Sequence, residues 1–261
     1  MDRYARLTRL LEILGEHGRV DVDDAVAELG ASPATIRRDL AHLQQQQLAT
    51  RTHGGAVATS VSYDLPLHFK SARRAREKAR IARAAAAMAS PGSIISLNGG
   101  TTTTEVGRAI AVRPDLSDDS AEPQLTIVTN AVNIASELLV RPHLRVVLTG
   151  GVVRARSFEL FGPLASKVIA SLSVDIAFLG VNGFDAEFGA SAFSDAEAHT
   201  NAELARCARK VVVVADSSKI GMKAFAQICP AAEVDLLITD TGLGAEARAA
   251  IEAEGVEVLA V

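Results

Sequence analysis

The sequence predicts an α/β protein: an N-terminal winged helix-turn-helix followed by a C-terminal Rossmann-like layer, in which helices cover both faces of a parallel sheet. Three observations carry this prediction. Three short amphipathic segments fill the first 45 residues, and seven short apolar runs alternate with helical segments after residue 91. Residues 1–80 hold 13 Lys and Arg against 10 Asp and Glu, whereas residues 81–261 hold 14 against 21. This change of sign indicates two parts with different partners.

The composition is typical of a globular protein, with 48% hydrophobic and 22% charged residues among 261. No stretch reaches the ~18 apolar residues of a membrane span, and the charged N-terminus lacks the apolar core of a signal peptide. We therefore expect a cytoplasmic protein. Two cysteines and six scattered histidines offer no paired ligand spacing, so we expect neither a metal nor a cofactor.

Three helices are expected in the N-terminal part. Apolar residues recur at helical spacing from Tyr4 to Leu14, and this first helix ends near Gly18. A second helix follows Asp21 and ends at Gly30. Only about three residues separate it from a third, which is helix-turn-helix spacing.

The third helix, PATIRRDLAHLQQQ, is the expected DNA-recognition helix. Ser32 suits its N-cap, and Ile36 lies on its buried side. At 100° per residue, Arg38 lies roughly 200° from Ile36 and therefore points away from the core. A solvated arginine pair is the alternative, which three capped helices at this spacing disfavour. The expected DNA-contacting residues on this helix are Ser32, Thr35, Arg37 and Arg38.

The segment 48–57 alternates and then turns at Gly54-Gly55, which is typical of a small hairpin. A hairpin after a helix-turn-helix is a wing, from which Arg51 and His53 would contact DNA phosphates. The alternative is an ordinary loop that leads into the next domain.

Two stretches of this part, SPATIRRDL (32–40) and RTHGGA (51–56), resemble the N-terminal signature of the DeoR/GlpR family of bacterial sugar-metabolism repressors. The resemblance implies a DNA-binding repressor. One position departs from it, because Gln47 stands where the family usually has Gly. If that site needs a positive φ, Gln47 costs on the order of 1 kcal/mol.

We expect the DNA-binding domain over residues 1–58, a linker over 59–75 and an effector-binding domain over 76–261. The linker shows no sustained period and contains a proline. A basic helix begins near Arg73 and leads into the first apolar run, so it is a candidate route between effector and DNA. The alternatives are a solvated basic face and a passive tether.

The C-terminal part predicts a parallel sheet, because its strands are apolar throughout and alternate with helices. The expected strands are 93–97, 125–128, 144–148, 174–179, 211–215, 234–238 and 256–261. The expected helices are 102–112, 131–140, 163–172, 194–208 and 245–253.

Ligands of such sheets bind beyond the carboxyl ends of the strands, where five polar turns follow the expected strands. The first, NGGTTTT (98–104), combines glycines, hydroxyls and a helix N-terminus, which favours a phosphate. Neither the P-loop spacing nor GxGxxG is present, which disfavours nucleotide hydrolysis and dinucleotide binding. The expected effector-binding residues at this edge are Asn98, Gly99, Gly100, Thr101, Thr102, Thr103, Asn130, Gly150, Gly151, Arg154, Asn182 and Lys219.

The same turns resemble, in order, the motifs of the DeoR sensor domain, which is in turn similar to ribose-5-phosphate isomerase. The resemblance implies a sugar-phosphate effector, with Lys219 on its phosphate and Glu197 at the position of an isomerase carboxylate. Asn98 stands where the family usually has Asp. Leu179 and Asn182 stand where the isomerases have two carboxylates, so a sensor is favoured over an enzyme.

The sequence thus predicts a repressor of a carbohydrate catabolic operon. Its expected partners are a double-stranded DNA operator, a phosphorylated sugar and further copies of itself, as a homodimer or homotetramer. The alternatives are an isomerase-like sugar-phosphate enzyme with an accessory helix-turn-helix, and an activator without an effector.

Overall fold

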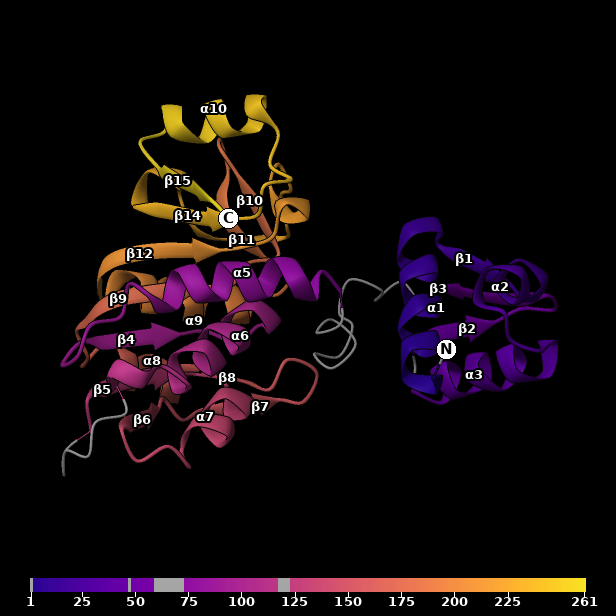
Figure 1. Ribbon diagram of the computed structural model, residues 1–261, viewed down its shortest axis with the longest axis horizontal. Helices are drawn as coiled ribbons and strands as arrows, with labels where there is room; N and C mark the ends of the chain where they lie inside the picture. The colour runs from indigo at the N-terminus through magenta and orange to yellow at the C-terminus, as the bar shows by residue number, and fades with distance from the viewer. Residues whose placement is uncertain (1, 47, 59–72, 117–122) are drawn as a thin grey trace. The chain divides into compact units, whose positions relative to one another are not determined.

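The computed structural model describes all residues except 1, 47, 59–72 and 117–122, and it divides into two compact units, 1–73 and 74–261 (Figure 1). The hypothesis on Gln47 and nearly all of the predicted linker lie outside the described residues. The first helix of the second unit begins at Ala75, within the segment predicted as linker.

The N-terminal unit is a winged helix-turn-helix, as predicted. Its helices are α1 (Arg3–His17), α2 (Val22–Leu29) and α3 (Pro33–Gln45), and its strands are β1 (Arg19–Asp21), β2 (Ala49–Arg51) and β3 (Gly55–Ala58). The predicted hairpin is β2–β3. The strand β1 pairs with β3 and was not predicted, because three residues are too few to show an alternating pattern.

The N-cap and the buried residues of α3 are those that the sequence predicts. The Ser32 side chain accepts a hydrogen bond from the Thr35 N–H, and Pro33 occupies the first helical position. Ile36, Leu40 and Leu43 are fully buried against the other two helices and the wing. This packing leaves the opposite face of α3 to solvent.

The C-terminal unit is built on a seven-stranded, wholly parallel sheet in the order β15-β14-β12-β9-β4-β5-β6. All seven predicted strands are present. They are β4 (Ile94–Leu97), β5 (Leu125–Thr129), β6 (Leu144–Leu148), β9 (Val174–Leu179), β12 (Ala208–Val214), β14 (Leu236–Thr239) and β15 (Glu257–Ala260). The strand order reverses between β4 and β9, so the ligand crevice of a Rossmann-type sheet is expected at their carboxyl ends.

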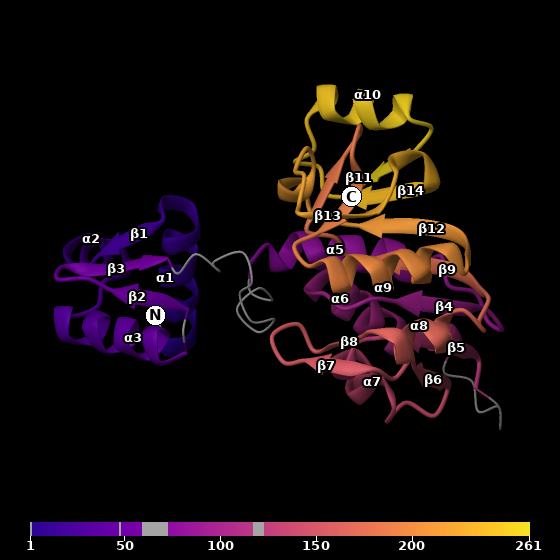
Figure 2. The same ribbon diagram turned by 180° about the vertical axis from the view of Figure 1, so that it is seen from behind.

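Helices cover both faces of this sheet, as the apolar strands predict. They are α5 (Ala75–Ala86), α6 (Thr101–Ala111), α7 (Val132–Leu138), α8 (Pro163–Ile169), α9 (Asp195–Arg206) and α10 (Ala245–Ala253). Val212 and Val214 pack on the side of α5, α6 and α7, whereas Val211 and Val213 pack on the side of α8, α9 and α10. Figure 1 shows the α5 and α6 face, and Figure 2 shows α8 and α9 from behind.

Short elements at the edges complete the unit and were not predicted. The strands β7 (Val152–Arg154) and β8 (Glu159–Phe161) form a hairpin, and β10 (Gly183–Asp185), β11 (Gly189–Ala192) and β13 (Ala226–Cys229) form a small antiparallel sheet. Single 3-10 turns lie at Pro114–Leu116, Ser217–Lys219 and Ala231–Glu233. Within the described ranges, none of the helices combines the length and apolar character that crossing a membrane requires.

Candidate DNA-binding surface and effector site

The outer face of α3 presents the predicted DNA-contacting side chains. Arg37 and Arg38 are exposed, Ser32 is exposed at the N-cap, and Thr35 is half-buried beside it. The Ser32 and Thr35 hydroxyls hydrogen-bond to each other at 2.9 Å. This face therefore combines two long cations with a polar helix start, which suits a DNA groove and a phosphate.

A buried ion pair fixes this helix and was not predicted. Asp39 on α3 is only 1% exposed, and its Oδ2 accepts from Nε of Arg6 on α1 at 2.5 Å. Because a buried carboxylate without a partner is costly, the pair ties the recognition helix to α1. An acidic residue within a basic helix is the only sequence signal for it.

The wing carries the other two predicted DNA-contacting residues, which differ in their exposure to solvent. His53 is exposed at the turn between β2 and β3. Arg51 is half-buried, and its Nη1 donates to the Arg37 carbonyl at 3.2 Å. Arg51 therefore connects the wing to the recognition helix, in addition to any phosphate contact it makes.

At the strand-order reversal, Asn98 joins the ends of β4 and β9. Its Nδ2 donates to the Gly180 carbonyl at 2.8 Å, and its Oδ1 accepts from the Gly180 N–H at 2.7 Å. The side chain is fully buried. The structure thus gives the Asn98 amide a bridging position between the ends of β4 and β9, and its contact with a ligand stays a prediction.

Asn98→Asp is expected to lower the free energy of unfolding by about 1–3 kcal/mol, because a carboxylate cannot donate to the Gly180 carbonyl and would leave it unpaired. Denaturant unfolding measures this difference. Asn182→Asp, in which the retained side-chain oxygen can still accept from the Phe193 N–H, is the comparison. If the Asn98→Asp variant were as stable as the wild type, the bridging position would be contradicted.

The turn between β4 and α6 has the backbone that the sequence predicts for a close approach. Gly100 is the N-cap of α6 with φ 155 and ψ 161, which side-chain-bearing residues rarely adopt, and no side chain caps the helix there. The hydroxyls of Thr103 and Thr104 donate to the Gly100 carbonyl, at 3.1 and 2.6 Å. Thr103 therefore shapes the turn, while the first N–H groups of α6 have no partner within the helix.

Glu159 lies against this turn and was not predicted. Its Oε1 accepts from the Gly99 N–H at 3.2 Å, and a Cβ placed on Gly99 would lie 2.1 Å from Cγ of Glu159. Glu159 is only 4% exposed. Gly99 is thus required by the close approach of a carboxyl group from the β7–β8 hairpin.

A second carboxyl group, Glu197, faces Glu159 from the start of α9. Burial, and next the negative charge of Glu197, raise the pKa of Glu159 to about 8. Nη1 of Arg154 forms an ion pair with Oε1 of Glu197 at 3.1 Å. The predicted residues Glu197 and Arg154 are therefore brought together, and Glu159, with its raised pKa, lies between them and the turn at Gly99.

The other predicted residues lie along the same edge. Asn130 follows β5, is 1% exposed, and donates through Nδ2 to the Leu160 carbonyl of β8 at 3.3 Å. Gly150 and Gly151 turn the chain from β6 into β7 with positive φ. Lys219 lies in the 3-10 turn after β12, two strands from β4 in the sheet.

The positions that resemble isomerase carboxylates hold no acid or base. Leu179 is fully buried in the core beneath α8 and α9. Asn182 accepts through Oδ1 from the Phe193 N–H at 3.1 Å. No three His, Cys, Asp or Glu side chains gather as a metal site in the part of the chain that the structure describes.

Comparison with known proteins agrees with the architecture of both units. The family model of the DeoR C-terminal sensor domain matches residues 73–241, and that of the DeoR-like helix-turn-helix domain matches residues 6–61. The putative aga operon transcriptional repressor of Escherichia coli O157:H7 is 32% identical over 259 residues, which cover 98% of this chain and 93% of that protein. The glycerol-3-phosphate regulon repressor of Escherichia coli K12 is 32% identical over 240 residues, covering 92% of each chain.

Among solved structures, ribose 5-phosphate isomerase A of Methanocaldococcus jannaschii is similar at a TM-score of 0.39 and 17% identity, covering 54% of this chain and 52% of that one. The sensor-domain match alone spans more than half of the chain, and both repressors match it over more than nine-tenths of its length. The chain therefore belongs to the DeoR family of transcriptional regulators, as its two signatures predicted.

Proposed function

We propose that this chain represses a carbohydrate catabolic operon, acting in the cytoplasm, and that a phosphorylated sugar releases it from its operator. DNA binding would use α3 and the wing of a homodimer or homotetramer, since helix-turn-helix proteins commonly read palindromic half-sites. The observation that carries the effector assignment is the uncapped start of α6 behind Gly100, at the strand-order reversal of the sheet.

The residues at this edge of the sheet favour one orientation of such a ligand. The N–H groups at the start of α6 and the charge of Lys219 favour the phosphate. On the other side, Oδ1 of Asn130 is a buried acceptor for which the described residues provide no donor. A sugar hydroxyl is such a donor, so the sugar would lie toward Asn130, Glu159 and Glu197.

A thermal-shift screen with a panel of phosphorylated sugars tests the assignment. A ligand at 100 times its Kd is expected to add roughly 2.7 kcal/mol to the unfolding free energy. The same sugars without phosphate are the controls and should give no shift. A hit must also reduce operator binding. A panel without any shift would argue against a sugar-phosphate effector.

The Glu159–Glu197 carboxyl pair favours a second candidate, an isomerase-like enzyme, because a buried carboxyl group with a raised pKa, here Glu159, can serve as a general acid. Conversion of an aldose phosphate to a ketose phosphate by purified protein would support it. We favour the sensor because Leu179 and Asn182 replace the two carboxylates of the isomerases that the sequence resembles.

Effector affinity is expected to fall as the pH rises through about 8, the pKa of Glu159. Below that pH the group is neutral. Above it, a second negative charge beside Glu197 repels the phosphate, and affinity falls by up to tenfold per pH unit. The phosphate itself is already dianionic, because its second pKa is about 6. Titration calorimetry between pH 7 and 9 measures the slope.

Glu159→Gln is the control, since the amide keeps the size of the side chain but cannot ionise. Its effector affinity should be nearly constant over the same pH range. If wild type and Glu159→Gln lose affinity in parallel, another group is responsible.

A further inference from the structure

Arg74 is the first residue of the C-terminal unit, directly before α5, and its backbone is unusual. With φ 49 and ψ 40 it lies in the left-handed region. Among the described residues, Phe158 is the only other non-glycine residue with a positive φ. Such conformations persist where surrounding contacts hold them, and they gather at switch regions.

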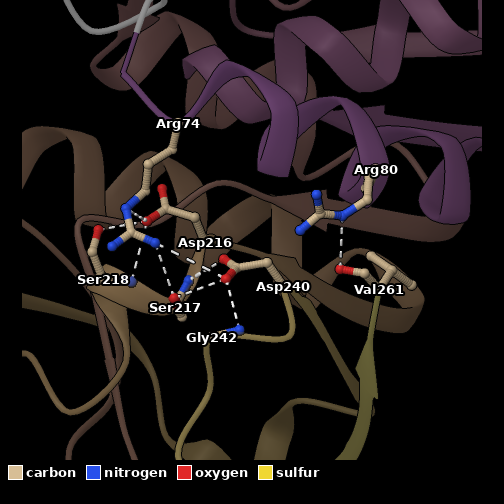
Figure 3. Close-up of polar contacts among 8 residues, drawn as sticks. All are labelled: Arg74, Arg80, Asp216, Ser217, Ser218, Asp240, Gly242 and Val261. Carbon is tan, nitrogen blue, oxygen red and sulfur yellow. Dashed lines mark hydrogen bonds and ion pairs between the residues drawn. The ribbon is translucent and has the colours of Figure 1, made fainter.

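The contacts that hold Arg74 come from the loops after β12 and β14 (Figure 3). Its Nη1 donates to Oγ of Ser217 at 3.0 Å and lies 4.0 Å from Oδ2 of Asp240. Its Nε lies 3.5 Å from Oδ1 of Asp216. The two carboxylates are almost fully buried, so the guanidinium is a major part of their charge balance.

The two loops form a preorganised receptor for this guanidinium. Asp240 accepts from the N–H groups of Ser217 at 2.7 Å and Gly242 at 3.0 Å. A Cβ on Gly242 would lie 2.7 Å from Oδ2 of Asp240, so the loop needs glycine there. Burial opposes ionisation of Asp240, but these hydrogen bonds and the Arg74 charge outweigh it and lower its pKa. Asp240 therefore stays anionic at neutral pH.

The receptor adjoins the proposed effector site through a single turn. Asp216 accepts from the Ser218 N–H at 3.1 Å and caps the 3-10 turn that ends in Lys219. A phosphate bound by Lys219 would act on the same short turn that carries Asp216 and Ser217, and the proposal requires that this turn shifts on binding. At its other side, Arg74 follows the segment that leads from the DNA-binding unit.

We propose that Arg74 is a latch between effector and DNA: bound by Asp216, Ser217 and Asp240, it fixes where the chain leaves the sensor domain, and effector binding releases it. The proposal rests on the proposed function. It replaces the route through β4 suggested by the sequence with a direct contact to the loops after β12 and β14. The latched form is the one competent for operator binding, because operator half-sites need a fixed spacing.

The helix α5 offers a matched control. Nε of Arg80 donates to the Val261 carbonyl at 3.1 Å, away from the two loops, as Figure 3 shows. Arg74→Gln and Asp240→Asn break the latch from its two sides, whereas Arg80→Gln removes an arginine from the same helix without touching it. Circular dichroism and thermal unfolding verify that each variant is folded.

The test measures affinity for an operator duplex selected with the wild-type protein, first without any effector. Arg74→Gln and Asp240→Asn should each bind at least tenfold more weakly than wild type, and Arg80→Gln should equal it. With a phosphorylated sugar that shifts the wild type, both latch variants should keep the thermal shift but lose most of the further change in DNA affinity. Wild-type binding and release by Arg74→Gln would overturn the proposal.

Amide hydrogen exchange at residues 78–81, the first N–H groups of α5 that are bonded within the helix, separates this outcome from failure of the proposed function. Both latch variants should exchange faster there than wild type and Arg80→Gln, whether or not an effector exists. A protein that responds to no phosphorylated sugar would refute the effector assignment. Unchanged exchange in Arg74→Gln would refute the latch by itself.

Discussion

Replacing Arg37 and Arg38 together by alanine is expected to abolish specific operator binding. Both side chains are exposed on α3, Arg38 opposite Ile36 and Leu40 and Arg37 beside that face. An arginine that reads a guanine edge contributes ~1–3 kcal/mol, so loss of both should weaken binding by well over tenfold. Fluorescence anisotropy with the selected operator measures the loss, and neither truncation should lower stability, because both side chains point to solvent.

The control is Arg19→Ala, an exposed arginine on β1 rather than on α3. It should keep nearly full operator affinity. Single substitutions then distinguish the roles, since a base contact changes specificity, whereas a phosphate contact weakens all duplexes about equally. A double variant that binds its operator as tightly as the wild type would exclude α3 as the recognition helix.

The recognition helix was predictable because its signals are local. Ser32 and Pro33 mark its start, and the spacing of Ile36, Leu40 and Leu43 marks its buried side. The seven parallel strands were predictable for a related reason, since burial on both faces makes each an apolar run. These features depend on neighbours within one helix or strand.

The contacts made by the β7–β8 hairpin were not predictable. Each strand has only three residues, and no period can appear in so short a segment. Glu159 reaches Gly99 across 60 positions, and a lone glutamate in an irregular stretch gives no sign of such a contact. The hydrogen bonds of Asn98 and Thr103 depend in the same way on tertiary packing and could not be read from residue type, and ligand contact by both stays a prediction.

Gly100→Ala is expected to remove the response to effector while leaving operator binding intact. The turn has φ 155 at this residue, and a Cβ there would lie 3.1 Å from Oγ1 of Thr103. Holding alanine in such a conformation costs about 1–3 kcal/mol, so the turn should relax and move the N–H groups at the start of α6. Effector affinity should fall by roughly tenfold to a hundredfold. Calorimetric titration measures it.

Gly244→Ala is the matched control, because Gly244 is also a glycine N-cap, at the start of α10. Its φ is −69, and a Cβ there would meet no atom within 4 Å. This variant should bind effector and operator as the wild type does. If Gly100→Ala still responds with wild-type affinity, the phosphate binds elsewhere along the carboxyl ends of the strands. If it loses operator binding as well, the turn acts on the fold of the protein rather than on its ligand, because the DNA-contacting residues belong to a separate unit.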